Sequence, residues 1–287
     1  MDLSEYRRKK VGASTELEGI LPNAVFDVSP TKKVIFSRGN LQFRKQGTHE
    51  TVEGTKAGVW RFAENQYDYI GEENQKVSES YTGWIDLFGW GTSGWENRDP
   101  WMTKKGEVAY YPHGNKLPIN SQCDCSFGDW GVYNAISNGG NAPGLWRSLT
   151  EEEMTYLLTH NGGWTLAYAK AKLCMLLFPK SFPLNQYSIK TLYTRSWHEE
   201  NDGKIKLIKY SAEQFSEMEK YGVVALPCAG ERDENSLSWI GTGGSCWLSS
   251  VNADGRPEIL WFCTKQAFTG YNKVRYYGFS VRLIHDL

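Results

Sequence analysis

Residues 150–163, TEEEMTYLLTHNGG, carry both the start and the stop signals of an amphipathic helix, and the fold class follows from what surrounds them. Thr150 and Glu153 have the spacing of a capping box, in which each side chain binds the backbone N–H of the other residue. An apolar stripe with i, i+3, i+4 spacing follows: Met154, Leu157 and Leu158. The glycines at 162–163 end the helix.

A second helix is predicted from Ser211, which is capped by Gln214 three residues later, to Gly222. On both sides of the helices the chain alternates short apolar segments with turn residues, as strands do. The predicted strands are 25–28, 34–36, 41–43, 222–226, 246–250, 258–263 and 278–284. Strands, two helices and strands again predict an α+β fold. We expect both helices to pack on one antiparallel sheet that includes the strands near Val34 and Val281 and brings the chain ends together.

Composition narrows the class of protein. Of 287 residues, 40% are hydrophobic and 23% charged, values typical of globular domains. The formal net charge is -1, so the chain has no net positive charge that would attract nucleic acid. Apolar runs fall far short of the ~18 residues that span a bilayer, so no membrane insertion is expected. Residues 1–20 are predicted to be an arm or linker before a domain at 21–287.

The start, MDLSEYRRKK, has no signal peptide as written. This predicts a virion or cytoplasmic location, or an extracellular one if an export signal has been removed. Without export, the six cysteines are expected to be reduced.

No motif predicts catalysis, a metal or a cofactor. Glu151, Glu152 and Glu153 complement the dipole of a helix N-terminus. Residues 241–244, GTGG, precede a predicted strand and not a helix, so a turn is expected rather than a phosphate loop. Cys123 and Cys125 have no second pair at zinc spacing, and the five histidines match no catalytic motif.

Aromatic residues are unusually frequent: 12 Trp, 16 Tyr and 12 Phe. Residues 71–144 show no period of 2 or 3.6, which predicts an ordered insertion held by its own aromatics. Within Tyr81–Trp95 we expect the densest apolar side chains to be scaffold: Trp84, Leu87, Phe88 and Trp90.

The predicted strand at 258–263 is apolar on both faces. If Leu260 and Phe262 face the core, then Ile259, Trp261 and Cys263 face the other way. The next stretch, TKQAFTGYNKVRYYG at 264–278, is rich in aromatics. These aromatics either pack on neighbouring loops or form a patch for a partner.

Four stretches together resemble a known family: 26–43 (FDVSPTKKVIFSRGNLQF), 129–158, 226–250 and 275–284 (RYYGFSVRLI). They are similar to proteins of Bacteroides-type bacteria and their phages in the formylglycine-generating-enzyme branch of the C-type lectin fold. That group includes the variable proteins of diversity-generating retroelements, whose C-terminal codons are mutated at adenines. The resemblance covers the chain from about Leu21 and implies a C-type lectin fold with long ordered loops.

The resemblance also implies roles for C-terminal residues, with a variable ligand-binding region at about 236–277. The scaffold would comprise Trp247, Leu260, Phe262, Gly278, Phe279, Val281, Arg282 and Leu283. Diversified positions would be Cys246, Leu248, Val251, Ala253, Cys263, Phe268, Tyr271, Tyr276 and Tyr277. Strand parity adds Ile259 and Trp261 to the ligand-binding face, and a polar rim is expected from Arg256, Lys265 and Lys273.

The function implied by this resemblance is non-enzymatic ligand binding, as in adhesion or the receptor-binding tip of a phage tail fibre. The partner would be a cell-surface protein or glycan receptor. Two alternatives remain: an oxidase related to formylglycine-generating enzymes, and an assembly protein that associates with itself or a fibre shaft. The oxidases have a cysteine pair four residues apart, and Cys263 has no such partner. The E-P-N, Q-P-D and W-N-D strings of calcium-dependent lectins are absent.

Overall fold

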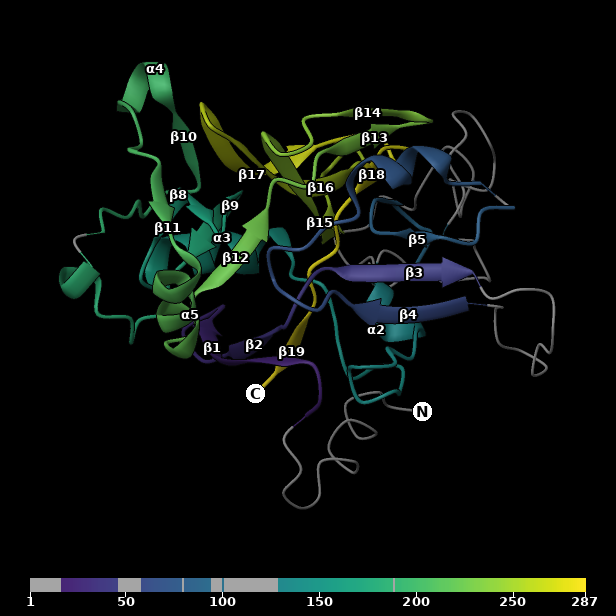
Figure 1. Ribbon diagram of the computed structural model, residues 1–287, viewed down its shortest axis with the longest axis horizontal. Helices are drawn as coiled ribbons and strands as arrows, with labels where there is room; N and C mark the ends of the chain where they lie inside the picture. Colours follow the sequence, from purple (N-terminus) through teal and green to yellow (C-terminus); the bar gives the residue numbers. More distant parts are fainter. Residues whose placement is uncertain (1–16, 46–57, 79, 94–99, 101–128, 188) are drawn as a thin grey trace.

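The first and last strands that the structure describes lie in one sheet. The computed structural model describes residues 17–45, 58–78, 80–93, 100, 129–187 and 189–287 (Figure 1). Strand β2 (Lys33–Ser37) lies between β1 (Ile20–Asp27) and β19 (Ile284–Asp286), and both pairings are antiparallel. This confirms that the two ends of the domain come together.

Both predicted helices are present with their caps. Helix α3 (Glu151–His160) has a complete capping box between Thr150 and Glu153, and α5 (Ala212–Lys220) has one between Ser211 and Gln214. Each helix contacts β1, but α3 also packs on the strands near the C-terminus and α5 on a different sheet. The expectation of a common sheet is therefore confirmed for the sheet that contains the strand near Val34, which both helices contact, but each helix also packs on a second sheet, and Val281 lies in the connection between β18 and β19.

The other four sheets contain the strands in the following spatial orders. The first is β10 (Ser196–His198), β17 (Gln266–Asn272), β16 (Pro257–Cys263) and β15 (Gly243–Val251). The second is β11 (Ile208–Tyr210), β8 (Trp164–Ala169), β9 (Lys172–Leu177) and β12 (Val224–Pro227). The third is β14 (Ser236–Ser238), β13 (Glu231–Asp233), β18 (Gly278–Phe279) and β6 (Phe88–Gly89). The fourth is β4 (Gly58–Phe62), β3 (Leu41–Lys45) and β5 (Trp84–Ile85).

Short helical turns complete the described elements: η1 (Gly71–Lys76), α2 (Trp130–Tyr133), η5 (Leu184–Tyr187) and α4 (Glu199–Asp202). The molecule is mostly β-sheet with few helices, which agrees with the α+β class. The described parts of 71–144 contain only short elements, as expected from the lack of a period.

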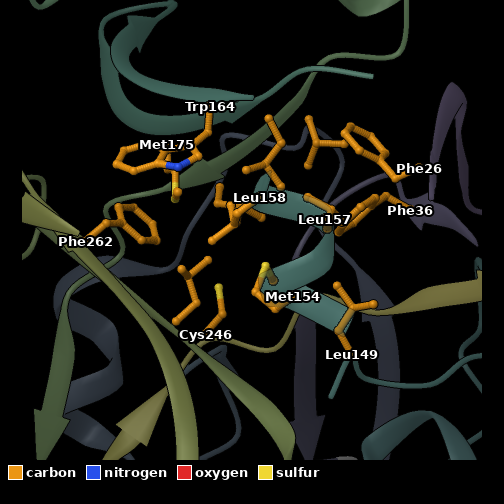
Figure 2. Close-up of a cluster of buried hydrophobic side chains, with 14 of the residues drawn as sticks. Phe26, Phe36, Leu149, Met154, Leu157, Leu158, Trp164, Met175, Cys246 and Phe262 are labelled. Atoms are coloured by element: carbon orange, nitrogen blue, oxygen red, sulfur yellow. The ribbon is translucent and has the colours of Figure 1, made fainter. Parts of the chain in front are cut away.

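Helix α3 lies at the centre of the largest buried cluster (Figure 2). Its stripe, Met154, Leu157 and Leu158, is 1–3% exposed. Around the stripe lie Phe26 and Phe36, Trp164 and Met175, and Cys246 and Phe262. Three sheets therefore meet on one helix face. Burial of each such side chain contributes about 1.5–3 kcal/mol, which fixes the sheets relative to one another.

The turn-rich segment after β5 supports the C-terminal strands from the other side. Leu87, Phe88 and Trp90 are fully buried, and the Trp247 indole N–H donates to the Phe88 carbonyl at 2.6 Å. The scaffold prediction is confirmed for these three residues. Trp84 is only half-buried, with the Arg61 guanidinium 3.7 Å from its ring centroid. Residues 94–95 lie outside the described part.

The predicted strand at 278–284 is divided into β18 and β19. Between them the backbone of Ser280 bonds to β15, with its carbonyl accepting from Trp247 N–H at 3.0 Å. The Arg282 side chain then enters the interior and donates to the Asn40 side chain and to the Gln66 and Ala225 carbonyls. Burial lowers the pKa of Arg282 to about 10. All eight predicted scaffold residues are buried.

Candidate ligand-binding surface

The two faces of β16 pack in different environments. Leu260 and Phe262 are 0% exposed and belong to the α3 cluster. Ile259, Trp261 and Cys263 belong to a second cluster with Trp247 and Phe279. The parity prediction is therefore confirmed, since alternate side chains of β16 point to opposite faces.

The face of β16 that carries Ile259, Trp261 and Cys263 is nevertheless largely buried. Several residues that were predicted to contact a ligand are therefore not at the surface. Ile259 is 0% and Cys263 4% exposed, because the second cluster packs over them. Cys246 (4%) and Leu248 (1%) lie in the α3 cluster. Cys246 pairs directly with Leu260, so it shares the inward face of that residue. Burial removes all four side chains from direct contact with a ligand.

A row of aromatic rings crosses the sheet where this face reaches the surface. We call Trp239, Trp261, Phe268 and Tyr271 the aromatic row. Neighbouring ring centroids are 6.3 Å, 5.2 Å and 5.2 Å apart in that order. Trp239 and Tyr271 at the ends are 50% and 46% exposed, whereas Trp261 between them is 8% exposed. Trp261 thus supports the row from below, and the predicted role of Trp261 as an exposed anchor is wrong.

Strand pairing places these rings side by side. Trp261 is the partner of Phe268, and Ile259 is the partner of Tyr271 on the same neighbouring strand. A break in register between residues 259 and 260 brings Tyr271 towards Phe268. On the far side, the His198 ring of β10 stacks on Phe268 at 5.6 Å. The strands β10, β16 and β17 therefore hold Phe268 between its neighbours in the row, and Trp239 joins the row from the turn before β15.

Trp239 is the site residue that the sequence analysis missed. Its φ of 62° is in the left-handed region, which a bulky residue rarely adopts. The turn at 239–243 holds this conformation, since the Trp239 carbonyl accepts from the Thr242 and Gly243 N–H groups at 2.9 Å and 2.8 Å. The adjacent GTGG sequence was the available signal, because it predicts a tight turn beside the strand.

Charged and phenolic groups border the row beside Tyr271. The Lys273 ammonium lies 5.8 Å from the Tyr271 ring centroid and 4.8 Å from that of Tyr277. Tyr277 stacks on the half-buried Tyr276 at 5.3 Å. Burial, followed by the charge of Asp233, raises the pKa of Tyr277 to about 12. Burial also raises the pKa of Glu231, against the opposing effect of Lys273. This border can both donate and accept hydrogen bonds.

The remaining predicted residues lie at the two ends of β16. Val251 is half-buried, and Ala253 and Arg256 are exposed in the turn between β15 and β16. Lys265 is exposed in the turn between β16 and β17. The seven residues of β16 separate the two turns by roughly 20 Å. Arg256 and Lys265 therefore do not form one rim, and only Lys273 of the three predicted cations adjoins the aromatic row.

Groups that could carry other chemistry have structural partners. Glu153 forms an ion pair with Arg147 at 2.6 Å, and Glu151 accepts from the Thr155 hydroxyl at 2.7 Å. Cys174, Cys228, Cys246 and Cys263 are free and buried, and burial raises the thiol pKa of Cys174 and of Cys246 to about 12. Cys123 and Cys125 lie outside the described residues. Within the described ranges, no three His, Cys, Asp or Glu side chains gather as metal ligands would.

Comparison with known protein families, curated proteins and solved structures found no match for this chain. Among the residues described, no helix has the length and hydrophobicity needed to cross a membrane.

Proposed function

We propose that the protein is a non-enzymatic binding protein whose aromatic row recognises a receptor on a cell surface. The observation that carries this proposal is that two exposed aromatics, Trp239 in the turn before β15 and Tyr271 on β17, lie at the two ends of one continuous row of rings. Large exposed aromatics are costly in water and are enriched where partners bind. Trp261 and Phe268 fill the space between them, so the apolar surface is continuous.

The composition of the surface favours a protein receptor over a glycan. Protein-binding hot spots combine central Trp and Tyr side chains with a polar border that excludes water. Here the border contains Lys273, Glu231 and Tyr277, and the Lys273 ammonium lies over the Tyr271 ring of the row and over the Tyr277 ring of the border. A rigid strand platform reduces the entropy lost on binding.

We further propose that the domain has a C-type lectin fold like that of the retroelement variable proteins. The four stretches that resemble that family support this proposal, together with the pairing of the first and last described strands. In such a protein the positions open to variation without loss of the core would be Val251, Ala253, Phe268, Tyr271, Tyr276 and Tyr277, which are exposed or half-buried.

The test is binding of fluorescently labelled protein to a panel of Bacteroides-type cells, measured by flow cytometry. Trp239→Ala and Tyr271→Ala should lose binding. Tyr193→Ala and Tyr221→Ala are matched controls, because these rings are 51% and 40% exposed but lie outside the row. Protease treatment of the cells should abolish binding, and periodate oxidation of surface glycans should leave it unchanged.

Two results would contradict the proposal. Equal binding by all four variants would place recognition elsewhere on the molecule, and loss of binding only after periodate would identify a glycan receptor. The assembly alternative predicts a different outcome: light scattering of the wild type would show an oligomer at micromolar concentration that Tyr271→Ala dissociates.

A further inference from the structure

A tryptophan that the core does not bury lies on the sheet of β4, β3 and β5, on the right in Figure 1. In β3, Phe43 faces inward and belongs, with Ile85 of β5, to the buried cluster around Trp247. Successive side chains of a strand point to opposite faces, so Arg44 lies on the outer face of the sheet. Its partner on β5 is Trp84, which therefore lies on the outer face as well.

Two guanidinium groups lie over the Trp84 ring. The Arg61 Cζ atom is 3.7 Å from the ring centroid, and the Arg44 Cζ atom is 4.9 Å from it. Both distances are those of cation–π contacts. Arg61 reaches the ring from β4, across its strand partner Gln42, whose side-chain oxygen accepts from the Arg61 Nε at 2.9 Å. The ring and this hydrogen bond together fix the orientation of the Arg61 guanidinium.

Most N–H groups of these two arginines have no acceptor in the part of the chain that the structure describes. Apart from the bond between Arg61 and Gln42, neither guanidinium forms a hydrogen bond or an ion pair there. Glu64 attracts Arg61, but its own ion pair is with Arg38, at 3.4 Å. Because a guanidinium presents its donors as a planar fork, each of the two stacked arginines keeps an edge of N–H groups free for an acceptor.

The two cations on the Trp84 ring also repel each other. Burial lowers the pKa of Arg61, Glu64 opposes this, and the charge of Arg44 lowers the pKa further. Both groups nevertheless stay charged, since arginine keeps its proton in proteins. Water solvates a lone surface cation, whereas two cations held at one ring both gain from a shared counter-ion. The geometry therefore favours an anion that both forks can reach.

We propose that Arg44 and Arg61 bind the dianion of a phosphate monoester, with Trp84 as the platform that holds both forks. Two forks offer four N–H groups, more than the two oxygens of a carboxylate can use, and a phosphate monoester presents three acceptor oxygens. Its charge of about −2 at neutral pH balances the two guanidinium charges. This inference does not depend on the receptor-binding role of the aromatic row.

Phenyl phosphate and phenyl sulfate are suitable probes, because they share one body and the sulfate carries a single charge. Titration by NMR should show phenyl phosphate shifting the signals of the Arg61 Nε–H and the Trp84 indole N–H. Phenyl sulfate should bind about fivefold more weakly. Affinity for phenyl phosphate should also fall as the pH is lowered through about 6, where the ester gains a proton, and affinity for phenyl sulfate should not.

Arg44→Gln and Arg61→Gln each remove one fork, and each should weaken phenyl phosphate by about fivefold. Melting curves of both variants should stay close to that of the wild type, because the inner face of the sheet is unchanged. Arg256→Gln is the matched control. Arg256 is an exposed arginine in the turn between β15 and β16, with no described aromatic ring beneath it, so its loss should leave the affinity unchanged.

Unchanged affinity in Arg44→Gln and Arg61→Gln, or no binding of phenyl phosphate at millimolar concentration, would overturn the site. Equal affinity for phenyl phosphate and phenyl sulfate would overturn the assignment of a dianion. Inorganic phosphate lacks the ester, and tighter binding of inorganic phosphate would overturn the assignment of a monoester. Loss of cell binding in the aromatic-row variants has no bearing on these results, so the two proposals fail independently.

Discussion

The two faces of β16 are built from similar side chains but end in different surroundings. Leu260 and Phe262 enter a core formed by α3 and three sheets, and nothing of them reaches the surface. Trp261 on the other face packs on two aromatic neighbours, Trp239 and Phe268, which are themselves exposed or half-buried. Hydrophobicity alone does not separate a core face from a ligand-binding face. The difference lies in the residues that pack over each face: those over Leu260 and Phe262 are buried themselves, whereas those over Trp261 reach the solvent.

The largest expected effect shows whether both faces contribute to stability. Trp261→Ala should lower the free energy of unfolding by about 3–5 kcal/mol, because its ring is 8% exposed and packs on two others. Leu260→Ala should cost about 2–5 kcal/mol. Chemical denaturation measures both values, and Lys265→Ala in the adjacent turn is the control. A loss below about 1 kcal/mol for Trp261→Ala would mean that this face is free surface.

A second prediction concerns Asp86, which is buried in the segment between β5 and β6. Burial raises the pKa of Asp86 to about 6, although the Ile70 N–H and the Asn74 amide donate to it. The native state therefore keeps a proton that the unfolded chain releases near pH 4. The stability from this group is fully present below about pH 4 and is lost as the pH rises through about 6.

The expected loss is up to about 3 kcal/mol. It should appear as a fall in the stability of the wild type relative to Asp86→Asn between pH 4 and pH 7. Denaturation curves across this range provide the measurement. Parallel pH profiles for the two proteins would show that Asp86 is ionised in the native state throughout.

A third prediction separates the ends of the aromatic row from its buried centre. Trp239→Ala should weaken receptor binding by ~2 kcal/mol or more, as for an exposed anchor. Its fold should remain intact, because the ring is 50% exposed and the turn at 239–243 is held by backbone hydrogen bonds. Cell-binding titration together with a melting curve tests this. A large drop in melting temperature without loss of affinity would reverse the assignment.

The smallest expected effect is at the border of the row. Lys273→Gln should reduce affinity by less than about 1 kcal/mol and mainly slow association, because rim charges act on encounter more than on the final complex. Binding rates at low and high salt measure this effect. An affinity loss as large as that of Trp239→Ala would move the centre of the site towards Lys273 and Tyr277.

An element of this fold could be predicted from the sequence when the residues that specify it lie close together along the chain. Both helices were predicted from the sequence because a capping box acts within four residues. The hairpin of β8 and β9 was not predicted as strands, since nearly all its side chains are buried and no alternation remains. The two turn residues, Lys170 and Ala171, have positive φ of 47° and 67°. Glycine or asparagine usually signals such a turn in a sequence, and neither is present here.

The same reasoning explains the errors at the candidate site. The two faces of β16 follow from the period of a strand, which is visible in the sequence. The burial of Cys246 follows from its pairing with Leu260, and pairing depends on register between strands that the sequence does not state. Trp239 lies in a turn and not on a strand, so the alternation of side chains along a strand could not predict that it belongs to the aromatic row.

The central claim is that the aromatic row, and not another exposed ring, contacts the receptor. Oxidative footprinting of the free and cell-bound protein, read by mass spectrometry, tests this directly. We predict that Trp239 and Tyr271 lose reactivity on binding while Tyr193 and Tyr221 keep theirs, because all four rings are accessible in the free protein. Protection of Tyr193 or Tyr221 with unchanged Trp239 and Tyr271 would contradict the account.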